Sequence, residues 1–349
     1  MTVSQTSSHL APALPLILWN VPPGLVRVLE QEGVPHLQAE PNSPSGRLVI
    51  APGRFCSRVD WRSLGKIALD LDRLRSEVQA LLKSWIGLAI DPFEALVDSV
   101  SAPLTWKDEE TGTVIRERAA SWDGGLIRRA VVTVLARKLN EVGGVWIGLG
   151  CAPWPHRSVF GFRLDLDESY PEDSALVLDR CVTTGLAPFT TVYLSTAAYL
   201  DQTTWLARLT RWRDAGIDVQ SHGHFHHLYR EKSHNYRNLV RAREILGGLG
   251  VHSEHFAAPG GRWNPGLNRV LEELAMVSSS EFALGRDDRP FRPWLESEGR
   301  WSKVWQVPIH PVCEGLFLEA GHPDPEGATL DHFSKVRAIE PRVCALMRI

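Results

Sequence analysis

The chain carries, at residues 159–168, the stretch VFGFRLDLDE, in which an apolar run ends in closely spaced carboxylates. A short apolar run that ends in polar residues is typical of a buried β-strand. Because side chains alternate between the two faces of a strand, Asp165 and Asp167 point to the same side. Two like charges on one face are costly unless a cation lies beside them or one carboxylate takes up a proton. The stretch therefore predicts a strand that delivers two carboxylates to one site; the alternative is that the strand has ended and both are solvated.

Strand and helix signals alternate regularly along the residues that follow this stretch. This alternation predicts parallel strands covered by helices, and barrel-like closure of such a sheet places functional residues at the carboxyl ends of the strands. The expected strands are 159–166, 189–194, 217–221, 254–258, 276–279 and 304–309, and the expected helices are 174–184, 203–215, 235–249 and 265–274.

The residues before the stretch give a second α/β pattern. Short apolar runs at 16–21 and 48–51 precede Pro-Gly turns, and apolar residues recur at helical spacing at 71–85 and 126–142. Residues 101–120 are charged and contain Thr and Gly, which predicts an exposed excursion. No catalytic constellation stands out in this part of the chain.

The length of the chain predicts two domains. At about 150 residues per domain, 349 residues correspond to about two domains. Gly and Pro gather at 143–157, which marks the boundary. We expect a smaller α/β accessory domain of unknown role at 1–150 and a catalytic domain at 151–349.

Composition and charge exclude several classes of protein. Hydrophobic residues make up 44% and charged residues 23% of the chain, which is typical of globular proteins rather than disordered or fibrous ones. Lys and Arg number 38 and Asp and Glu 41, giving a net charge of -3, so nucleic acid is not an expected partner. Five scattered cysteines predict a reducing compartment rather than a disulfide framework. The N-terminal residues lack a secretory pattern and no uncharged run resembles a membrane span, so we expect a cytoplasmic protein without an integral membrane segment.

Four histidines lie within the stretch SHGHFHH at residues 221–227, directly after an expected strand. His222 and His226 are four residues apart, a spacing that lets two imidazoles share one cation. Together with an aspartate at another strand end they predict a metal site, and two imidazoles with one carboxylate leave positions open for water. We expect His224 and His227 to face elsewhere.

Another histidine ends the last expected strand, in the stretch WQVPIHP at residues 305–311. His310 lies at the end of its strand where the other candidates also lie, which favours a general acid. The competing interpretation is a satisfied core histidine.

These motifs resemble those of the polysaccharide deacetylase family, the chitooligosaccharide-deacetylase homology domain of carbohydrate esterase family four. In that family one strand end carries a catalytic Asp followed by a metal-binding Asp, and a later strand end carries His-Ser/Thr-x-x-His. The stretches RLDLD and HGHFH are similar in order and spacing, over residues 155–320 and not over the first 150. The resemblance implies a distorted, incomplete (β/α) barrel.

The resemblance also implies roles for individual residues. Asp165 corresponds to the catalytic base, and Asp167, His222 and His226 correspond to the ligands of a divalent transition metal, for which we expect zinc. His310 corresponds to the late histidine that acts as the acid.

The loop FAAPGGRWN at residues 256–264 resembles the family's Arg-Pro-Pro-Tyr-Gly loop. From this loop we expect substrate contacts by four residues: oxyanion stabilisation by the backbone N–H of Gly260 or Gly261, and contacts from Arg262 and Trp263, whose indole suits stacking on a sugar ring. Ala257 stands where the family has the arginine that steadies the base, and Arg163 or Arg262 are the candidates to replace it.

Two further departures concern the carboxylates. The family's aspartates are adjacent, whereas Leu166 separates them here; a similar D-x-D arrangement occurs in the branch that resembles the lipid-linked aminoarabinose deformylases. Where the family has the aspartate that tunes the acid histidine, residues 277–281 offer only Glu281.

The leading interpretation is a metal-dependent hydrolase that removes an acetyl or formyl group from the nitrogen of an amino sugar or an amino-sugar conjugate. Alternatives are a hydrolase of another non-peptide C–N bond on the same scaffold, a degenerate non-catalytic carbohydrate-binding protein, and an interaction protein with a structural metal. A base, an acid and an open coordination position favour the hydrolase over the last two.

Overall fold

The computed structural model describes residues 15–39, 48–87, 89–98, 101–107, 111–147, 161–167, 171–281, 283–309 and 314–339. Two compact units account for the chain: one combines Met1–Val97 with Ile127–Leu149, and the other combines Asp98–Leu126 with Gly150–Ile349. Residues 98–126 thus group with the second unit, although they precede position 150. The functional division at that position stays a prediction.

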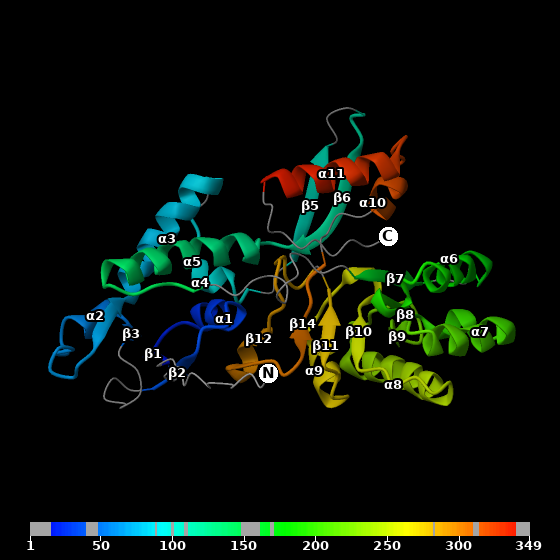
Figure 1. Ribbon diagram of the computed structural model, residues 1–349, viewed down its shortest axis with the longest axis horizontal. Coiled ribbons are helices and arrows are strands. Elements are labelled where there is room, and N and C mark those ends of the chain that lie inside the picture. Colours follow the sequence, from blue (N-terminus) through cyan, green and yellow to red (C-terminus); the bar gives the residue numbers. More distant parts are fainter. Residues whose placement is uncertain are drawn as a thin grey trace, which may run out of the picture. The chain divides into compact units, whose positions relative to one another are not determined.

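The second unit is built on a parallel sheet of six strands in the order β14-β11-β10-β9-β8-β7 (Figure 1). All six strands and four helices expected beyond residue 158 are present, which confirms a mixed α/β unit with parallel strands. The strands are β7 (Phe162–Leu166), β8 (Thr190–Leu194), β9 (Asp218–Ser221), β10 (His255–Ala257), β11 (Ser278–Ser280) and β14 (Trp305–Gln306), and the helices are α6 (Pro171–Thr183), α7 (Thr203–Asp214), α8 (Lys232–Gly248) and α9 (Pro265–Glu273).

The alternation of side chains along β7 separates the core from the polar face. Leu164 and Leu166 pack into a core that contains residues of α6 and α7. Arg163 and Asp165, at the alternate positions, therefore point to the opposite face of the sheet. The buried members of this core from the other elements include Leu178, Val192, Leu194, Leu209, Trp212 and Val219.

The sheet is strongly curved. Nη1 of Arg163 on β7 donates to Oγ of Ser280 on β11 at 2.9 Å, although these strands are four places apart in the sheet. At about 4.8 Å per strand a flat sheet would separate them by about 19 Å, far beyond the reach of an arginine side chain. Among the described residues β7 and β14 remain its two edges, so the curvature is shown and the barrel itself stays a prediction.

The first unit contains a parallel sheet in the order β2-β1-β3-β4. Apolar runs predict β1 (Leu16–Leu18) and β3 (Leu48–Ala51). Neither β2 (His36–Gln38), which has no such run, nor β4 (Ile67–Asp70), whose run at 67–69 is short, was expected. Its helices are α1 (Pro23–Gln31), α2 (Gly53–Cys56), α3 (Leu71–Ile86), α4 (Pro92–Ala95) and most of α5 (Gly124–Glu141). The α/β pattern expected for this part of the chain is therefore present.

The charged segment 101–120 forms an antiparallel hairpin of β5 (Ser101–Lys107) and β6 (Val114–Ala120). The expectation of an exposed excursion was wrong for one face of β6, because Ile115 is fully buried against Leu316 and Phe317 of α10 (Glu314–Glu319). Arg116 and Arg118 lie at the alternate positions of the strand and are exposed, whereas Glu117 is partly buried on the face of Ile115. Helix α11 (Pro325–Ile339), the short pair β12 (Trp294–Leu295) and β13 (Arg300–Trp301), and four single-turn 3₁₀ segments complete the described elements.

None of the described helices combines the length and the apolar character that a membrane span requires.

Candidate metal centre

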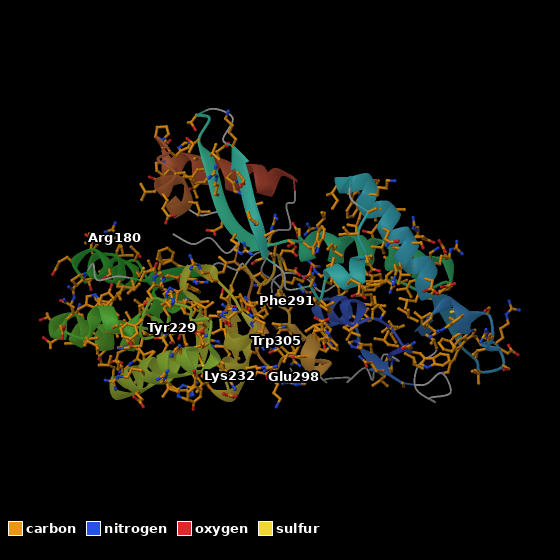
Figure 2. The ribbon with its side chains drawn as sticks, turned by 180° about the vertical axis from the view of Figure 1, so that it is seen from behind. Arg180, Tyr229, Lys232, Phe291, Glu298 and Trp305 are labelled. Carbon is orange, nitrogen blue, oxygen red and sulfur yellow. The ribbon has the colours of Figure 1, made fainter. Side chains whose placement is uncertain are left out.

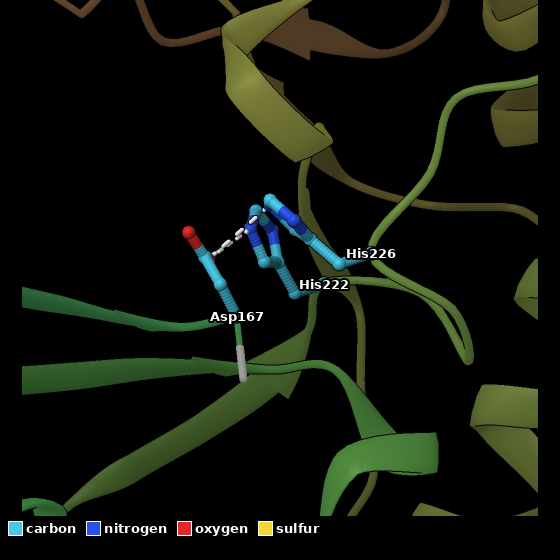
Figure 3. A group of neighbouring side chains, drawn as sticks. All are labelled: Asp167, His222 and His226. Carbon is cyan, nitrogen blue, oxygen red and sulfur yellow. Dashed lines mark ion pairs between the residues drawn. The ribbon is translucent and has the colours of Figure 1, made fainter. Parts of the chain in front are cut away.

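Three side chains predicted as metal ligands meet at the carboxyl edge of the six-stranded sheet (Figure 3). Asp167 follows the last residue of β7, and His222 follows the last residue of β9. One potential donor atom from each of Asp167, His222 and His226 lies within 4.8 Å of the other two. Oδ1 of Asp167 is 2.9 Å from Nε2 of His222 and 3.3 Å from Nε2 of His226.

The environment of His222 defines which ring nitrogen faces this cluster. The side chain is fully buried, and its Nδ1 lies 2.7 Å from the carbonyl oxygen of Ala257. A carbonyl oxygen only accepts, so Nδ1 carries a proton and Nε2 is the ring nitrogen that faces Oδ1 of Asp167. A nitrogen 2.9 Å from a carboxylate oxygen is favourable when a proton lies between the two atoms or a cation binds both, and Nε2 of His226 faces the same oxygen. The donor set therefore fits a divalent metal.

The three candidate ligands differ in how much of each side chain is exposed to solvent. The side chain of His222 is 0% exposed, whereas those of Asp167 and His226 are 28% and 30% exposed. One ligand thus lies in the protein and two lie at its surface, which leaves solvent access to one side of the centre. Such access is what a catalytic site needs and a closed structural site lacks.

A buried asparagine on α8 holds the loop between the two histidines. Oδ1 of Asn238 accepts from the N–H of Phe225 at 2.8 Å, and its Nδ2 donates to the carbonyl oxygens of Phe225 and His227, each at 3.2 Å. The loop begins at Gly223, whose φ of 92° suits glycine and whose missing Cβ would lie 2.9 Å from Nδ2 of Asn238. Asn238 was not expected as a functional residue.

A second asparagine one turn earlier secures the continuation of the loop. Asn235 is fully buried and exchanges two hydrogen bonds of 2.8 Å with the backbone of Tyr229, which Figure 2 labels. The available sequence signal is two asparagines three residues apart in the expected helix 235–249, because asparagine is disfavoured in a helix interior.

The other two histidines of the loop face away from the cluster, as expected. His224 shares a hydrogen bond of 2.9 Å between its Nδ1 and Oγ1 of Thr196, and burial, with a smaller effect from the charge of Arg241, lowers its pKa. The ring of His227 packs edge-on against Tyr229, with 4.6 Å between ring centroids. Both therefore support the loop.

Asp165 is held by an arginine on its own strand. Nε and Nη2 of Arg163 donate to Oδ1 and Oδ2 of Asp165 at 2.6 and 2.7 Å, and both side chains are almost fully buried. The guanidinium also lies over the ring of Tyr193, 4.7 Å from its centroid. Burial opposes its charge, but the carboxylate of Asp165 outweighs that effect and raises the pKa of Arg163. Of the two arginines considered from the sequence, Arg163 contacts Asp165, while the side chain of Arg262 is exposed.

Glu281 is a fully buried carboxyl group just beyond β11. Its Oε1 accepts a hydrogen bond from Oγ of Ser279, and its Oε2 has no hydrogen-bond partner in the described part of the chain. Burial raises the pKa of Glu281 to about 7, against the opposing effects of Ser279, Gln306 and the charge of Arg163. The sequence does not indicate that the pKa of Glu281 lies near 7, because this shift depends on the complete burial of the side chain.

The loop after β10 contains the residues expected to contact substrate. Gly260 and Gly261 both have φ of 61°, and the N–H of Gly261 already donates to the carbonyl oxygen of Ala258 at 2.9 Å. Trp263 is partly buried and packs against two apolar clusters, with no hydrogen-bond partner for its Nε1 among the described atoms. His310, the expected acid, lies outside the described residues.

No protein-family model matches the sequence, and no curated protein matches it. Among solved structures the chain is similar to the family 4 carbohydrate esterase from Streptomyces lividans, with 18% identity over 35% of this chain and 60% of the esterase and a TM-score of 0.29. It is also similar to the deacetylase PplD from Streptococcus pyogenes, with 13% identity over 54% of this chain and 77% of that one and a TM-score of 0.34. A third similar structure is Puue allantoinase, with 14% identity over 58% of this chain and 82% of that one and a TM-score of 0.44.

The chain thus spans three fifths of the length of the esterase it matches. Two of these three structures are described as a deacetylase or carbohydrate esterase and one as an allantoinase.

Proposed function

We propose that the chain is a metal-dependent hydrolase that removes an N-acyl group, acetyl or formyl, from an amino sugar or amino-sugar conjugate. The observation that carries the proposal is the contrast between two carboxylates at the end of one strand. Asp167 faces two imidazoles, whereas Asp165 is paired with a buried arginine. Different surroundings for neighbouring carboxylates support different roles.

Asp167, His222 and His226 would hold the cation. Two imidazoles and one carboxylate suit zinc with an open position, and we propose zinc as the ion. A divalent cation in this place supplies Lewis-acid chemistry, because it polarises a carbonyl oxygen and lowers the pKa of water. Ala257 contributes through its backbone, since its carbonyl orients His222 and fixes the tautomer.

Asp165 is proposed as the general base that accepts the proton of the attacking water. Its pairing with Arg163 fixes the orientation of the carboxylate, while each oxygen retains a further lone pair. Arg163 is thus proposed as the residue that steadies the base, in place of an arginine at position 257. This support comes from the strand that carries the base itself.

His310 is proposed as the acid that protonates the departing nitrogen. An amine leaves an acyl group readily only when it is protonated, so an amide substrate needs such a donor. Gly260, Gly261, Arg262 and Trp263 are proposed to contact the sugar and its acyl group. The engaged N–H of Gly261 favours Gly260 as the oxyanion donor of the pair.

The experiment that tests the proposal is metal analysis of the purified chain combined with a screen for release of free amine. The substrates are N-acetyl and N-formyl amino sugars, free and as conjugates, with a cyclic amide and a ureide as non-sugar comparisons. Turnover of the amino sugars that is lost on chelation and restored by zinc is the expected result. Turnover of only the non-sugar amides would show that the substrate is not an amino sugar. Sugar binding without turnover would favour the non-catalytic alternative.

A further inference from the structure

The first unit contains a cavity of about 430 Å³ that the proposed reaction does not use. Its wall comes from three segments, each directly after a strand of the parallel sheet. Asn20 and Pro22 follow β1, Pro52 and Arg54 follow β3, and Asp72 follows β4. The cavity therefore lies at the carboxyl edge of the sheet β2-β1-β3-β4.

The strand order of this sheet is one that predicts a ligand site at its carboxyl edge. The first strand in sequence, β1, lies between β2 and β3, so the chain reverses its direction of progress across the sheet at β1. In open parallel α/β sheets ligands bind outside the carboxyl ends of the strands at such a reversal. The volume also falls within the range of small-molecule sites, about 300 to 1,000 Å³.

Two arginines in the wall indicate the charge of the ligand. The guanidinium of Arg54 lies over the ring of Phe55 at 4.9 Å from its centroid and is exposed to solvent. Arg75 is held by Asp91, with 3.1 Å between Nη1 and Oδ2, and its Nε has no hydrogen-bond partner among the described atoms. A planar guanidinium whose orientation is already restricted suits a phosphate or carboxylate group.

Acceptors in the same wall indicate that the ligand also carries hydroxyl groups. Oδ2 of Asp72 accepts from the N–H of Gly53 at 2.9 Å, which fixes the carboxylate and leaves it further lone pairs. Asn20, at a left-handed φ of 52°, adds an amide from the other side. A carboxylate in the wall disfavours a bare multivalent anion, whereas hydroxyl groups can donate to it.

We propose that this cavity binds a small hydroxylated anion, a sugar phosphate or sugar acid. Its oxyanion binds Arg54 and Arg75, and its hydroxyl groups bind Asp72 and Asn20. The site shares no residue with the candidate metal centre, because all its residues belong to the first unit. It gives the first unit a binding role that is independent of the proposed hydrolysis.

The test is calorimetric titration of the full chain with glucose 6-phosphate, glucuronate and glucose, with a chelator present so that phosphate cannot bind at the metal centre. Saturable binding of at least one anion, and weaker binding of glucose, is expected. The two anions distinguish a phosphate from a carboxylate. Arg54→Gln should weaken binding by about tenfold or more, because a charge-assisted hydrogen bond is lost.

Matched variants separate binding from folding. Arg58→Gln removes an exposed arginine close in sequence that does not line the cavity, and it should bind as the unaltered chain does. Arg75→Lys keeps a cation beside Asp91 but loses the planar fork, so it should fold normally and bind more weakly. No saturable binding of either anion below about 10 mM, glucose binding as well as the anions, or equal affinity in Arg54→Gln and the unaltered chain would overturn the proposal.

Discussion

Nδ1 of His222 donates to the carbonyl oxygen of Ala257 at 2.7 Å, and this contact orients the only fully buried side chain of the three candidate ligands. The acceptor is a backbone group of β10, so substitution of the alanine side chain does not remove it. The hydrogen bond leaves Nε2 as the free donor atom for a metal. The metal centre therefore depends on the pairing of β9 with β10 as well as on its ligands.

Replacing either histidine ligand should remove the metal. The unaltered chain should contain about one zinc, and His222→Ala or His226→Ala should contain little, because one carboxylate and one imidazole bind weakly. Elemental analysis of each purified variant measures this. His252→Ala, at a highly exposed histidine, is the control. Unchanged metal content in both ligand variants would contradict the assignment.

Asp165→Asn should keep the metal and lose hydrolysis. Loss of a general base costs on the order of 10² to 10⁴ in rate. The variant should also melt at a lower temperature, because Arg163 remains buried without its carboxylate. Rate and metal content are therefore measured well below its melting temperature. If Asp165→Asn loses the metal and Asp167→Asn keeps it, the two roles are reversed.

Asn238→Ala should weaken metal binding although Asn238 is not a ligand. It removes the three hydrogen bonds that the Asn238 side chain makes to the backbone of Phe225 and His227, and loss of such support costs about 10- to 100-fold in metal affinity. Asn238→Asp keeps the acceptor for the N–H of Phe225. Its metal affinity should lie between those of the unaltered chain and Asn238→Ala. Zinc titration and the visible spectrum of the cobalt-substituted chain check the affinity and the ligand geometry. Unaltered metal affinity in a folded Asn238→Ala variant would show that the loop keeps its conformation without the Asn238 side chain.

Glu281 should make stability depend on pH between about 4.5 and 7. Its pKa rises from an ordinary value of 4.5 to about 7 in the folded chain, so the folded state binds the extra proton in this window. Stability should fall as pH rises through the window and level off above it, by on the order of 3 kcal/mol in total. Denaturant unfolding of the unaltered chain and Glu281→Gln at pH 5 and pH 8 isolates this contribution as a difference. The same pH dependence in both would mean that Glu281 does not titrate there.

The acid role of His310 predicts a dependence on the leaving group. His310→Ala should damage hydrolysis of an acetamide far more than that of an activated aryl ester of the same acid, because a phenolate leaves without a proton. Rates on both substrates are compared with metal content and melting temperature for the same variant. Equal losses on both would indicate a positioning role, and a lower melting temperature without dependence on the leaving group would indicate a core histidine.

Local patterns predicted the six strands and four helices of the second unit and the meeting of the three candidate metal ligands. The apolar run before Asp165 and the four-residue spacing of the histidines depend on neighbours in sequence, and the structure brings Asp167, His222 and His226 together as expected. The strands β2 and β4 were missed because β2 has no apolar run and the run of β4, at 67–69, is too short to show a period.

Contacts between distant segments could not be predicted in the same way. The carbonyl of Ala257 reaches His222 only because their strands are adjacent, and Asn238 reaches the loop only because α8 packs against it. Glu281 likewise lies beside a residue distant in sequence, because Nε2 of Gln306 on β14 donates to its carbonyl oxygen. Sequence spacing contains no record of these distances.

The placement of Asp167 and His222 has a consequence for chain entropy. They are 55 residues apart, and their strands are separated in the sheet by β8. A cation that binds both would close this loop and act as a crosslink between β7 and β9, favouring the folded ensemble by mass action. The same ion would then support the reaction and stabilise the sheet. The folded fraction and the activity would therefore both rise with the concentration of free metal.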